Sequence, residues 1–219
     1  MQDRRIFLQR LALSTGAVIL MPAITRCAAP QSAAATPAPR NPDEPVRSAA
    51  EGWDAIAYNR DRGNAGFIPA TYQAAINAES GPKEALGKHL PYLPALEAVP
   101  PGFIAIMWGD TSKGYARHPN AARSEANNQQ GHWYDWIRIR KAVEGEAEEL
   151  QSNYSDWPGT APSDNGAYAV FGGGDITADS GKNTIYLAAL PEGVKSGDRV
   201  RVWAHCLTHG EYVDFLTVP

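Results

Sequence analysis

The chain has 219 residues, of which 43% are hydrophobic and 20% are charged, and its formal net charge is −4 at pH 7. Residues 1–40 contribute +4, from five arginines and one aspartate, so that residues 41–219 carry −8. This acidic balance leaves no basic stripe, which excludes nucleic acid as an expected partner. Without a processed leader, roughly 170–180 residues remain, enough for one domain with its own core.

The N-terminus has the features of an export signal. Two adjacent arginines at 4–5 precede a short, mildly apolar run at 11–21 that contains no acidic residue. This arrangement resembles a twin-arginine signal, and the run is too short to span a bilayer comfortably. We therefore expect residues 1–35 to be a signal peptide and the mature protein to be periplasmic or otherwise extracytoplasmic. Arg26 directly before Cys27 fits a lipoprotein box poorly, so a soluble product is favoured over lipid anchoring through Cys27.

Two segments separate this signal from the main folded part. Residues 36–48 are rich in proline, alanine and charge, which is typical of a linker. Residues 49–86 lack a strand pattern. We expect them to form an irregular, short-helical extension that packs on the core, with one short helix at 69–78.

The rest of the chain has the pattern of short β-strands. Apolar or alternating segments recur between turns rich in glycine, proline and asparagine. Six segments have this pattern: 102–108, 133–139, 167–171, 184–189, 199–206 and 212–218. Their spacing favours an all-β fold, either an antiparallel sandwich or a barrel. The acidic stretch at 144–150 is expected to be a solvated loop or a single helical turn.

Cys206 stands at the end of the longest alternating segment, three residues before His209. The alternation directs Cys206 to the apolar face of its strand and His205 to the opposite face. If Cys27 leaves with the signal, Cys206 is a lone thiol in an oxidising compartment, and metal ligation is one reason to retain it. A buried free cysteine beside a histidine is also common in protein cores, so this pair alone leaves both interpretations open.

Four of the five histidines lie at strand edges or in loops flanked by proline or glycine, where a sandwich gathers functional residues at one end. These are His89, His118, His132 and His209. Together with Cys206 they make a set of four imidazoles and one thiolate, with a sixth position open. Such a set suits iron, copper or zinc.

Four short motifs arrive in a characteristic order. They are Lys-His-Leu-Pro at 88–91, His-Pro-Asn at 118–120, His132 shortly before Trp-Ile at 136–137, and Cys-Leu-Thr-His-Gly at 206–210. In this order they resemble the superoxide reductase family, which includes neelaredoxin and the catalytic domain of desulfoferrodoxin. The resemblance covers residues 87–219, and its specificity lies in the ordered set rather than in any single motif.

The resemblance implies an immunoglobulin-like antiparallel β-sandwich of about seven strands that carries one mononuclear non-haem iron (Fe²⁺/Fe³⁺). It implies four equatorial histidine ligands, an axial thiolate and a charged residue above the open position: His89, His118, His132, His209, Cys206 and Lys88. The implied activity is the one-electron reduction of superoxide to hydrogen peroxide. A separate small redox protein would donate the electron, because no cysteine-rich rubredoxin-like module precedes the sandwich.

Three positions depart from the family's pattern. His118 and His132 are fourteen residues apart where the family usually has six, so residues 121–131 are expected to be an inserted loop. Gly87 stands where many members have a glutamate that caps the open site. Leu207 replaces an asparagine after the axial cysteine, which can change the hydrogen bonds around the sulfur and the redox potential.

Two other functions stay open at this point. The chain can be an iron-binding or electron-transfer module of the same fold without fast superoxide turnover. It can also be a metal-free sandwich that serves as an interaction domain, with structural histidines. In each case the sheet edges can pair, so a homo-oligomer is compatible with the sequence.

Overall fold

A computed structural model of the protein describes residues 45–219. The predicted signal peptide at 1–35 and most of the predicted linker at 36–48 lie outside the described residues. Within residues 45–219, no helix is both long and apolar enough to cross a membrane.

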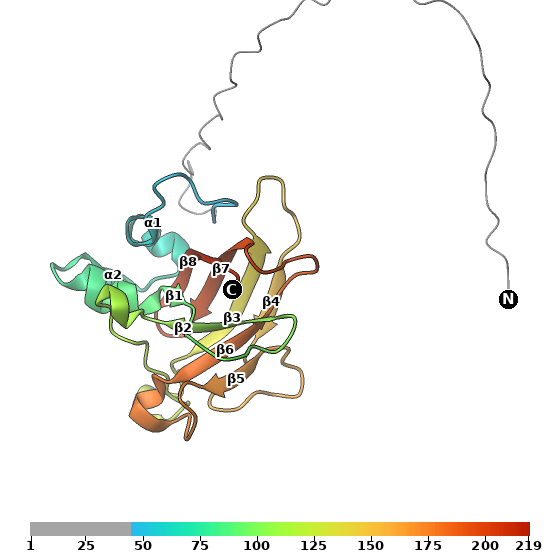
Figure 1. Ribbon diagram of the computed structural model, residues 1–219. Coiled ribbons are helices and arrows are strands. Elements are labelled where there is room, and N and C mark those ends of the chain that lie inside the picture. Colours follow the sequence, from blue (N-terminus) through green and yellow to red (C-terminus); the bar gives the residue numbers. More distant parts are fainter. Residues whose placement is uncertain (1–44) are drawn as a thin grey trace, which may run out of the picture. The chain divides into compact units, whose positions relative to one another are not determined.

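Two four-stranded antiparallel sheets form the body of the described structure (Figure 1). One sheet has the order β1-β2-β6-β5, with the strands β1 (Pro91–Tyr92), β2 (Phe103–Trp108), β6 (Thr184–Ala189) and β5 (Ala167–Val170). The other has the order β4-β3-β7-β8, with the strands β4 (Leu150–Asn153), β3 (Tyr134–Lys141), β7 (Arg199–Cys206) and β8 (Gly210–Thr217). The predicted all-β antiparallel sandwich is confirmed, with eight strands where about seven were expected.

The strands that the sequence analysis expected lie where alternation placed them, to within a few residues at their ends. The bounds of β6 and β7 are those predicted from the sequence. Two strands were not expected. β1 has only two residues, and β4 lies at the end of the acidic stretch at 144–150 and runs beyond it.

Side chains from both sheets meet in one core. In β7, every second side chain is fully buried, as the alternation predicted: Val200, Val202, Ala204 and Cys206. They pack with isoleucines of β2 and β3 from the two sheets. Burying each of these larger aliphatic side chains stabilises the fold by about 1.5–3 kcal/mol.

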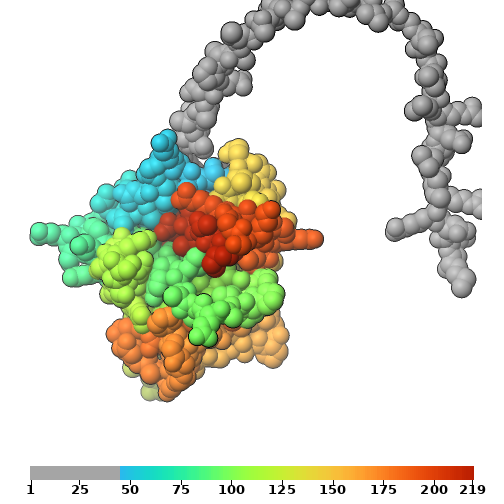
Figure 2. Space-filling view, in the orientation of Figure 1, coloured from blue at the N-terminus to red at the C-terminus, as the bar shows by residue number. Residues whose placement is uncertain are grey.

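Short helices precede the sandwich and pack against β8. These are α1 (Ala55–Arg62), α2 (Ala70–Asn77), a one-turn π-helix (Pro82–Leu86) and 3₁₀ turns at 63–66 and 87–89. α2 corresponds to the helix predicted at 69–78, whereas α1 was not expected. In the space-filling view, the blue and green residues of these helices adjoin the red C-terminal strands (Figure 2).

The outer edge of β8 is covered by α1. Asp54 caps the start of α1, where its side chain accepts a hydrogen bond from the Ala57 amide at 3.0 Å. The buried Asn59 side chain then makes two hydrogen bonds to the backbone of Val213, of 2.7 and 2.8 Å. An edge strand exposes unpaired backbone groups, and Asn59 satisfies two of them.

Candidate metal centre

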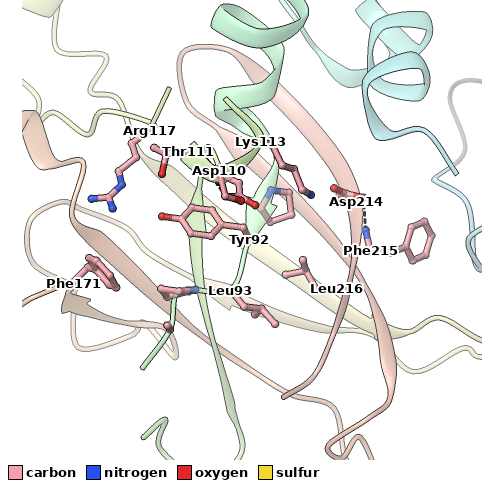
Figure 3. A pocket seen from close by; sticks show the side chains of 14 residues that line it. Tyr92, Leu93, Asp110, Thr111, Lys113, Arg117, Phe171, Asp214, Phe215 and Leu216 are labelled. Carbon is pink, nitrogen blue, oxygen red and sulfur yellow. Dashed lines mark hydrogen bonds between the residues drawn. The ribbon is translucent and has the colours of Figure 1, made fainter. Parts of the chain in front are cut away.

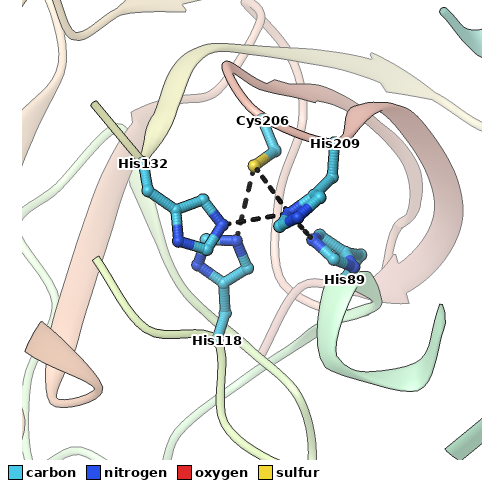
Figure 4. A group of neighbouring side chains, drawn as sticks. All are labelled: His89, His118, His132, Cys206 and His209. Carbon is cyan, nitrogen blue, oxygen red and sulfur yellow. Dashed lines mark hydrogen bonds between the residues drawn. The ribbon is translucent and has the colours of Figure 1, made fainter. Parts of the chain in front are cut away.

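Five side chains from separate parts of the chain converge at one end of the sandwich (Figure 4). Each offers one nitrogen or sulfur atom, and these atoms all lie within 4.8 Å of one another. The residues are His89, His118, His132, Cys206 and His209. The structure therefore brings together all five residues that the sequence analysis proposed as metal ligands.

His118 is held by the loop that follows β2. Its backbone amide donates to the Trp108 carbonyl at 3.0 Å. Two residues later, the buried Asn120 side chain donates to the Gly181 carbonyl at 2.8 Å and accepts from the Tyr186 hydroxyl at 2.6 Å. The His-Pro-Asn motif therefore fixes its histidine by hydrogen bonds to two neighbouring segments.

His132 reaches the cluster because the inserted loop is closed at its base. Ala121 and His132 form an isolated antiparallel bridge, with backbone hydrogen bonds of 2.9 and 2.8 Å. The expected loop at 121–131 thus leaves the site and returns to it at the next ligand. The longer spacing between His118 and His132 does not separate their side chains, whose ring centroids lie 4.4 Å apart.

Cys206 and His209 are joined by the tight turn between β7 and β8. Cys206 pairs with Gly210, and the His209 amide donates to the Cys206 carbonyl at 3.2 Å. Gly210 has a φ of +88°, and a Cβ there would lie 2.6 Å from the Gly66 carbonyl oxygen. Only glycine fits this position, since it combines a left-handed backbone with close contact to another segment.

The ring of His89 is oriented by a backbone carbonyl. Its Nδ1 donates to the Ala85 oxygen at 2.8 Å, so in the neutral ring the proton lies on Nδ1 and Nε2 has a free lone pair. This Nε2 lies 3.1 Å from Nδ1 of His209, and Nε2 of His132 lies at the same distance from that atom.

Burial keeps the four imidazoles neutral. The pKa values of His89 and His118 lie well below the usual value for histidine, primarily because both rings are enclosed by protein. Burial lowers the pKa of His132 to about 4 and, with repulsion from His132, lowers the pKa of His209 to about 3. Neutral imidazoles are the form that binds a metal ion.

Cys206 supplies the remaining donor atom. Its Sγ lies 3.5 Å from Nε2 of His118 and 3.8 Å from Nδ1 of His209. Burial raises the pKa of the thiol to about 12, so a metal-free site holds it protonated. A thiol that coordinates a metal ion loses this proton, because the charge of the ion stabilises the thiolate.

The arrangement of the donors fits a transition-metal ion. When two imidazole nitrogens bind one metal ion at about 2.1 Å each, with the two bonds at right angles, the nitrogens lie about 3.0 Å apart. The two contacts to Nδ1 of His209 are close to this distance, at 3.1 Å. Hydrogen bonds explain the arrangement less well. Nδ1 of His209 carries at most one proton, yet two nitrogens at 3.1 Å and one sulfur at 3.8 Å surround it. Four neutral nitrogens and one sulfur suit iron, copper or zinc.

Lys88 lies beside the cluster, next to His89 in the chain. It is partly buried, and burial lowers the pKa of its ammonium group, while the Cys206 thiolate opposes this shift. The positive charge of Lys88 contributes to the low pKa values of all four histidines. Its Nζ atom lies 5.3 Å from the centroid of the Tyr72 ring, which stacks on His209, so the ammonium group lies beside the cluster.

Two aromatic residues that stack on ligand rings were not expected from the sequence. Tyr212 of β8 stacks on the His89 ring, with centroids 4.4 Å apart. Tyr72 of α2 stacks on the His209 ring, with centroids 3.8 Å apart and planes at 28°. Its hydroxyl donates to the Ala85 carbonyl at 2.8 Å. Tyr72 belongs to no recognisable motif, so no signal in the sequence distinguishes it from the other tyrosines.

His205 lies away from the cluster, as strand alternation predicted. Its Nδ1 is 2.6 Å from the Asp135 carboxylate, and its ring stacks on Trp136 with centroids 5.7 Å apart. Trp133 and Tyr134, which precede Trp136 in the chain, are fully buried in the core.

A separate cavity of about 400 Å³ lies between the 110–113 turn and β8 (Figure 3). Tyr92, Arg117 and Asp214 are among the residues that line it, and no predicted metal ligand or Lys88 does. This cavity is therefore distinct from the candidate metal centre.

The fold and the site together define an all-β protein with a largely buried four-histidine, one-cysteine group that can hold a metal ion. No protein-family model and no curated protein matches the sequence. Among solved structures, the chain is similar to a variant of the superoxide reductase (neelaredoxin) from Archaeoglobus fulgidus in the reduced form. The sequence identity is 17%, the match covers 60% of this chain and 89% of that chain, and the TM-score is 0.29. A similarity at this TM-score gives no evidence of function. The evidence of function comes from the side chains of the site.

Proposed function

We propose that the protein binds one iron ion through His89, His118, His132, His209 and Cys206 and reduces superoxide to hydrogen peroxide. The observation that carries the proposal is the convergence of these five donor atoms within 4.8 Å of one another. Their order along the chain supports iron and superoxide in particular, since the motifs that hold them resemble the superoxide reductase family.

The reaction consumes one electron and two protons for each superoxide. A bound Fe²⁺ ion would supply the electron, and a separate small redox protein would restore it after each turnover. Cys206 contributes a thiolate, whose negative charge favours the ferric state over the ferrous state. The four neutral imidazoles would complete the donor set that holds the ion.

Lys88 acts on the substrate rather than on the metal. Superoxide is an anion, and the ammonium of Lys88 attracts it toward the cluster. The same group can hold the water molecule that delivers one of the two protons, while the second proton comes from solvent. Both roles need the ammonium near the cluster, and its position 5.3 Å from the Tyr72 ring, which stacks on His209, supports them.

The first test is the metal content and the visible spectrum of the purified protein, before and after oxidation. We expect about one iron per chain and a broad band in the red on oxidation, which arises from thiolate-to-iron charge transfer. Zinc in place of iron would contradict the iron site. The absence of any metal in protein that folded with iron present would favour a metal-free interaction domain.

The second test is the reaction of the Fe²⁺ form with superoxide in a stopped-flow instrument. An electrostatically guided reaction should approach about 10⁸–10⁹ M⁻¹s⁻¹ at low ionic strength. A slow bimolecular reaction of the iron-loaded protein would exclude the reductase and favour an iron-binding or electron-transfer module.

The export proposal has its own test. If the arginine pair at 4–5 directs twin-arginine export, replacement of both by lysine should retain the protein in the cytoplasm, whereas the wild-type chain appears outside it. Unchanged fractionation of the variant would contradict this route.

A further inference from the structure

Tyr72 contacts the candidate metal centre from outside the sandwich. It lies on α2, in the helical segment that precedes the first strand. Its ring stacks on His209 at 3.8 Å, and it also meets the ring of His89 edge-on, with centroids 5.4 Å apart. No other aromatic ring stacks face-to-face on His209 in the described part of the chain.

His209 differs from the other three histidines in how it faces the cluster. The others direct Nε2 toward their neighbours, whereas His209 directs Nδ1. Among residues 45–219, no hydrogen bond to Nε2 of His209 fixes its ring, in contrast to the Nδ1 of His89. The ring of His209 therefore depends on packing for its orientation, and Tyr72 provides the stacked face.

The hydroxyl of Tyr72 links the same side chain to His89. The Ala85 carbonyl accepts one hydrogen bond from the Tyr72 hydroxyl and one from Nδ1 of His89, both of 2.8 Å. Tyr72 thus contacts one ligand with its ring face and shares a backbone acceptor with another. Groups that orient metal ligands in this way usually affect metal affinity by about 10–100-fold.

The ring of Tyr72 also lies under the ammonium of Lys88. The Nζ atom is 5.3 Å from the ring centroid, within the range of a cation–π interaction. One side chain from α2 therefore contacts two proposed ligands and the proposed anion-attracting group.

We propose that Tyr72 is a positioning residue of the metal centre and that its aromatic ring holds His209 with Nδ1 directed at the metal. The short helices before the sandwich are then part of the site and do more than cover the edge of β8. This inference rests on the metal-binding part of the proposed function and is independent of superoxide turnover.

The test is a titration of metal-free protein with Co²⁺, whose visible absorption reports binding directly. Tyr72→Leu removes the ring and should weaken Co²⁺ binding about ten-fold or more. Tyr72→Phe keeps the ring and should restore most of this affinity. Tyr115→Leu is the matched control, since Tyr115 packs on the same apolar cluster without stacking on any of the histidines.

Nuclear magnetic resonance of the metal-free wild-type protein tests the stack without relying on a variant that folds. The carbon-bound protons of the His209 ring should be shifted upfield by the Tyr72 ring current, and the shift should persist in Tyr72→Phe. Unshifted His209 signals in the wild-type protein would overturn the proposal. Equal Co²⁺ affinities for wild type and Tyr72→Leu would do so as well, as would an equal loss in Tyr115→Leu.

The outcome of the Co²⁺ titration does not depend on whether the protein reduces superoxide. A Co²⁺ defect in Tyr72→Leu, restored by phenylalanine, supports the inference even if the Fe²⁺ wild type reacts slowly with superoxide. Fast superoxide reduction by the wild type together with unchanged Co²⁺ affinity in Tyr72→Leu would overturn the inference alone. A wild-type protein that binds no Co²⁺ would overturn it together with the metal site.

Discussion

The ring of Tyr115 lies against Gly87 and fills the space that a side chain at position 87 would need. A Cβ on Gly87 would stand 2.4 Å from the Tyr115 Cδ1 atom. The Gly87 backbone has φ −57° and ψ −31°, which any residue adopts, so packing rather than conformation requires the glycine. In the family that the sequence resembles, many members carry glutamate at this position.

This contact predicts a cost for restoring that glutamate. Gly87→Glu should lower the free energy of unfolding by about 1–3 kcal/mol, because the new side chain must displace a packed ring. The loss should be smaller in a Tyr115→Ala background, and urea unfolding of the four proteins measures this coupling. Gly159→Glu is the control, since a Cβ at that position meets no atom within 4 Å. Additive effects of the Gly87 and Tyr115 changes would show that the two positions are not coupled.

Cys206→Ser should remove the thiolate-to-iron band from the visible spectrum of the iron-loaded protein and leave the fold largely intact. The serine hydroxyl is close in size to the thiol that it replaces, but it is not ionised near neutral pH and is a poorer donor to a soft metal site. Circular dichroism gives the control for the fold. A band that persisted in the variant would show that the sulfur of Cys206 is not its source.

Lys88→Ala should slow the reaction with superoxide about ten-fold or more at low ionic strength and flatten its salt dependence. Iron content should stay unchanged, because the lysine is not among the donor atoms. The measurement is the stopped-flow rate as a function of salt. Lys83→Ala is the matched control, because Lys83 is exposed on the same short segment. Equal rates for the wild type and Lys88→Ala at low salt would argue against a role for Lys88 in attracting the anion.

Asp214 predicts a pH dependence of stability outside the metal centre. Its carboxylate accepts hydrogen bonds from Trp53 Nε1 and the Phe215 amide, at 2.9 and 2.7 Å. Burial nevertheless raises the pKa of Asp214 above its ordinary value. A raised folded-state pKa contributes stability below the unfolded-state value of about 3.9, and that contribution is lost as pH rises through the folded-state pKa.

Asp214→Asn keeps an acceptor oxygen but cannot ionise. Relative to the wild type, the variant should therefore gain stability as pH increases from about 4 to about 7. Urea unfolding of both proteins across this range measures the difference. A difference in unfolding free energy that stays constant with pH would contradict the raised pKa.

The pattern of apolar and polar residues predicted the strands whose side chains alternate. It did not predict a strand that forms only because its backbone pairs with a neighbouring strand. The bounds of β6 and β7 follow from their apolar alternation. β4 has the sequence Leu-Gln-Ser-Asn, which carries no such alternation, and it is a strand because it pairs with β3. α1 has no apolar stripe, and its Asn59 and Arg62 side chains tie it to β8.

The identity of the proposed ligands was accessible from the sequence because each occurs in a short motif whose residues are neighbours in the chain. The sequence also predicted a loop between His118 and His132, since residues 121–131 are polar and rich in asparagine and glutamine. What the motifs do not contain is the arrangement between them. His89 and His209 are 120 residues apart, yet their facing nitrogens lie 3.1 Å from each other.

The sequence by itself therefore determined the all-β class, the alternation that buries Cys206, and the five residue types that can ligate a metal. Only the tertiary structure decided which nitrogen of each histidine faces the cluster, that Tyr72 stacks on His209, and that Tyr115 excludes a side chain at Gly87. The physical reason is that alternation and turn chemistry act between neighbours in the chain. Ring orientation and close packing depend instead on contacts between segments that only the closed sandwich brings together.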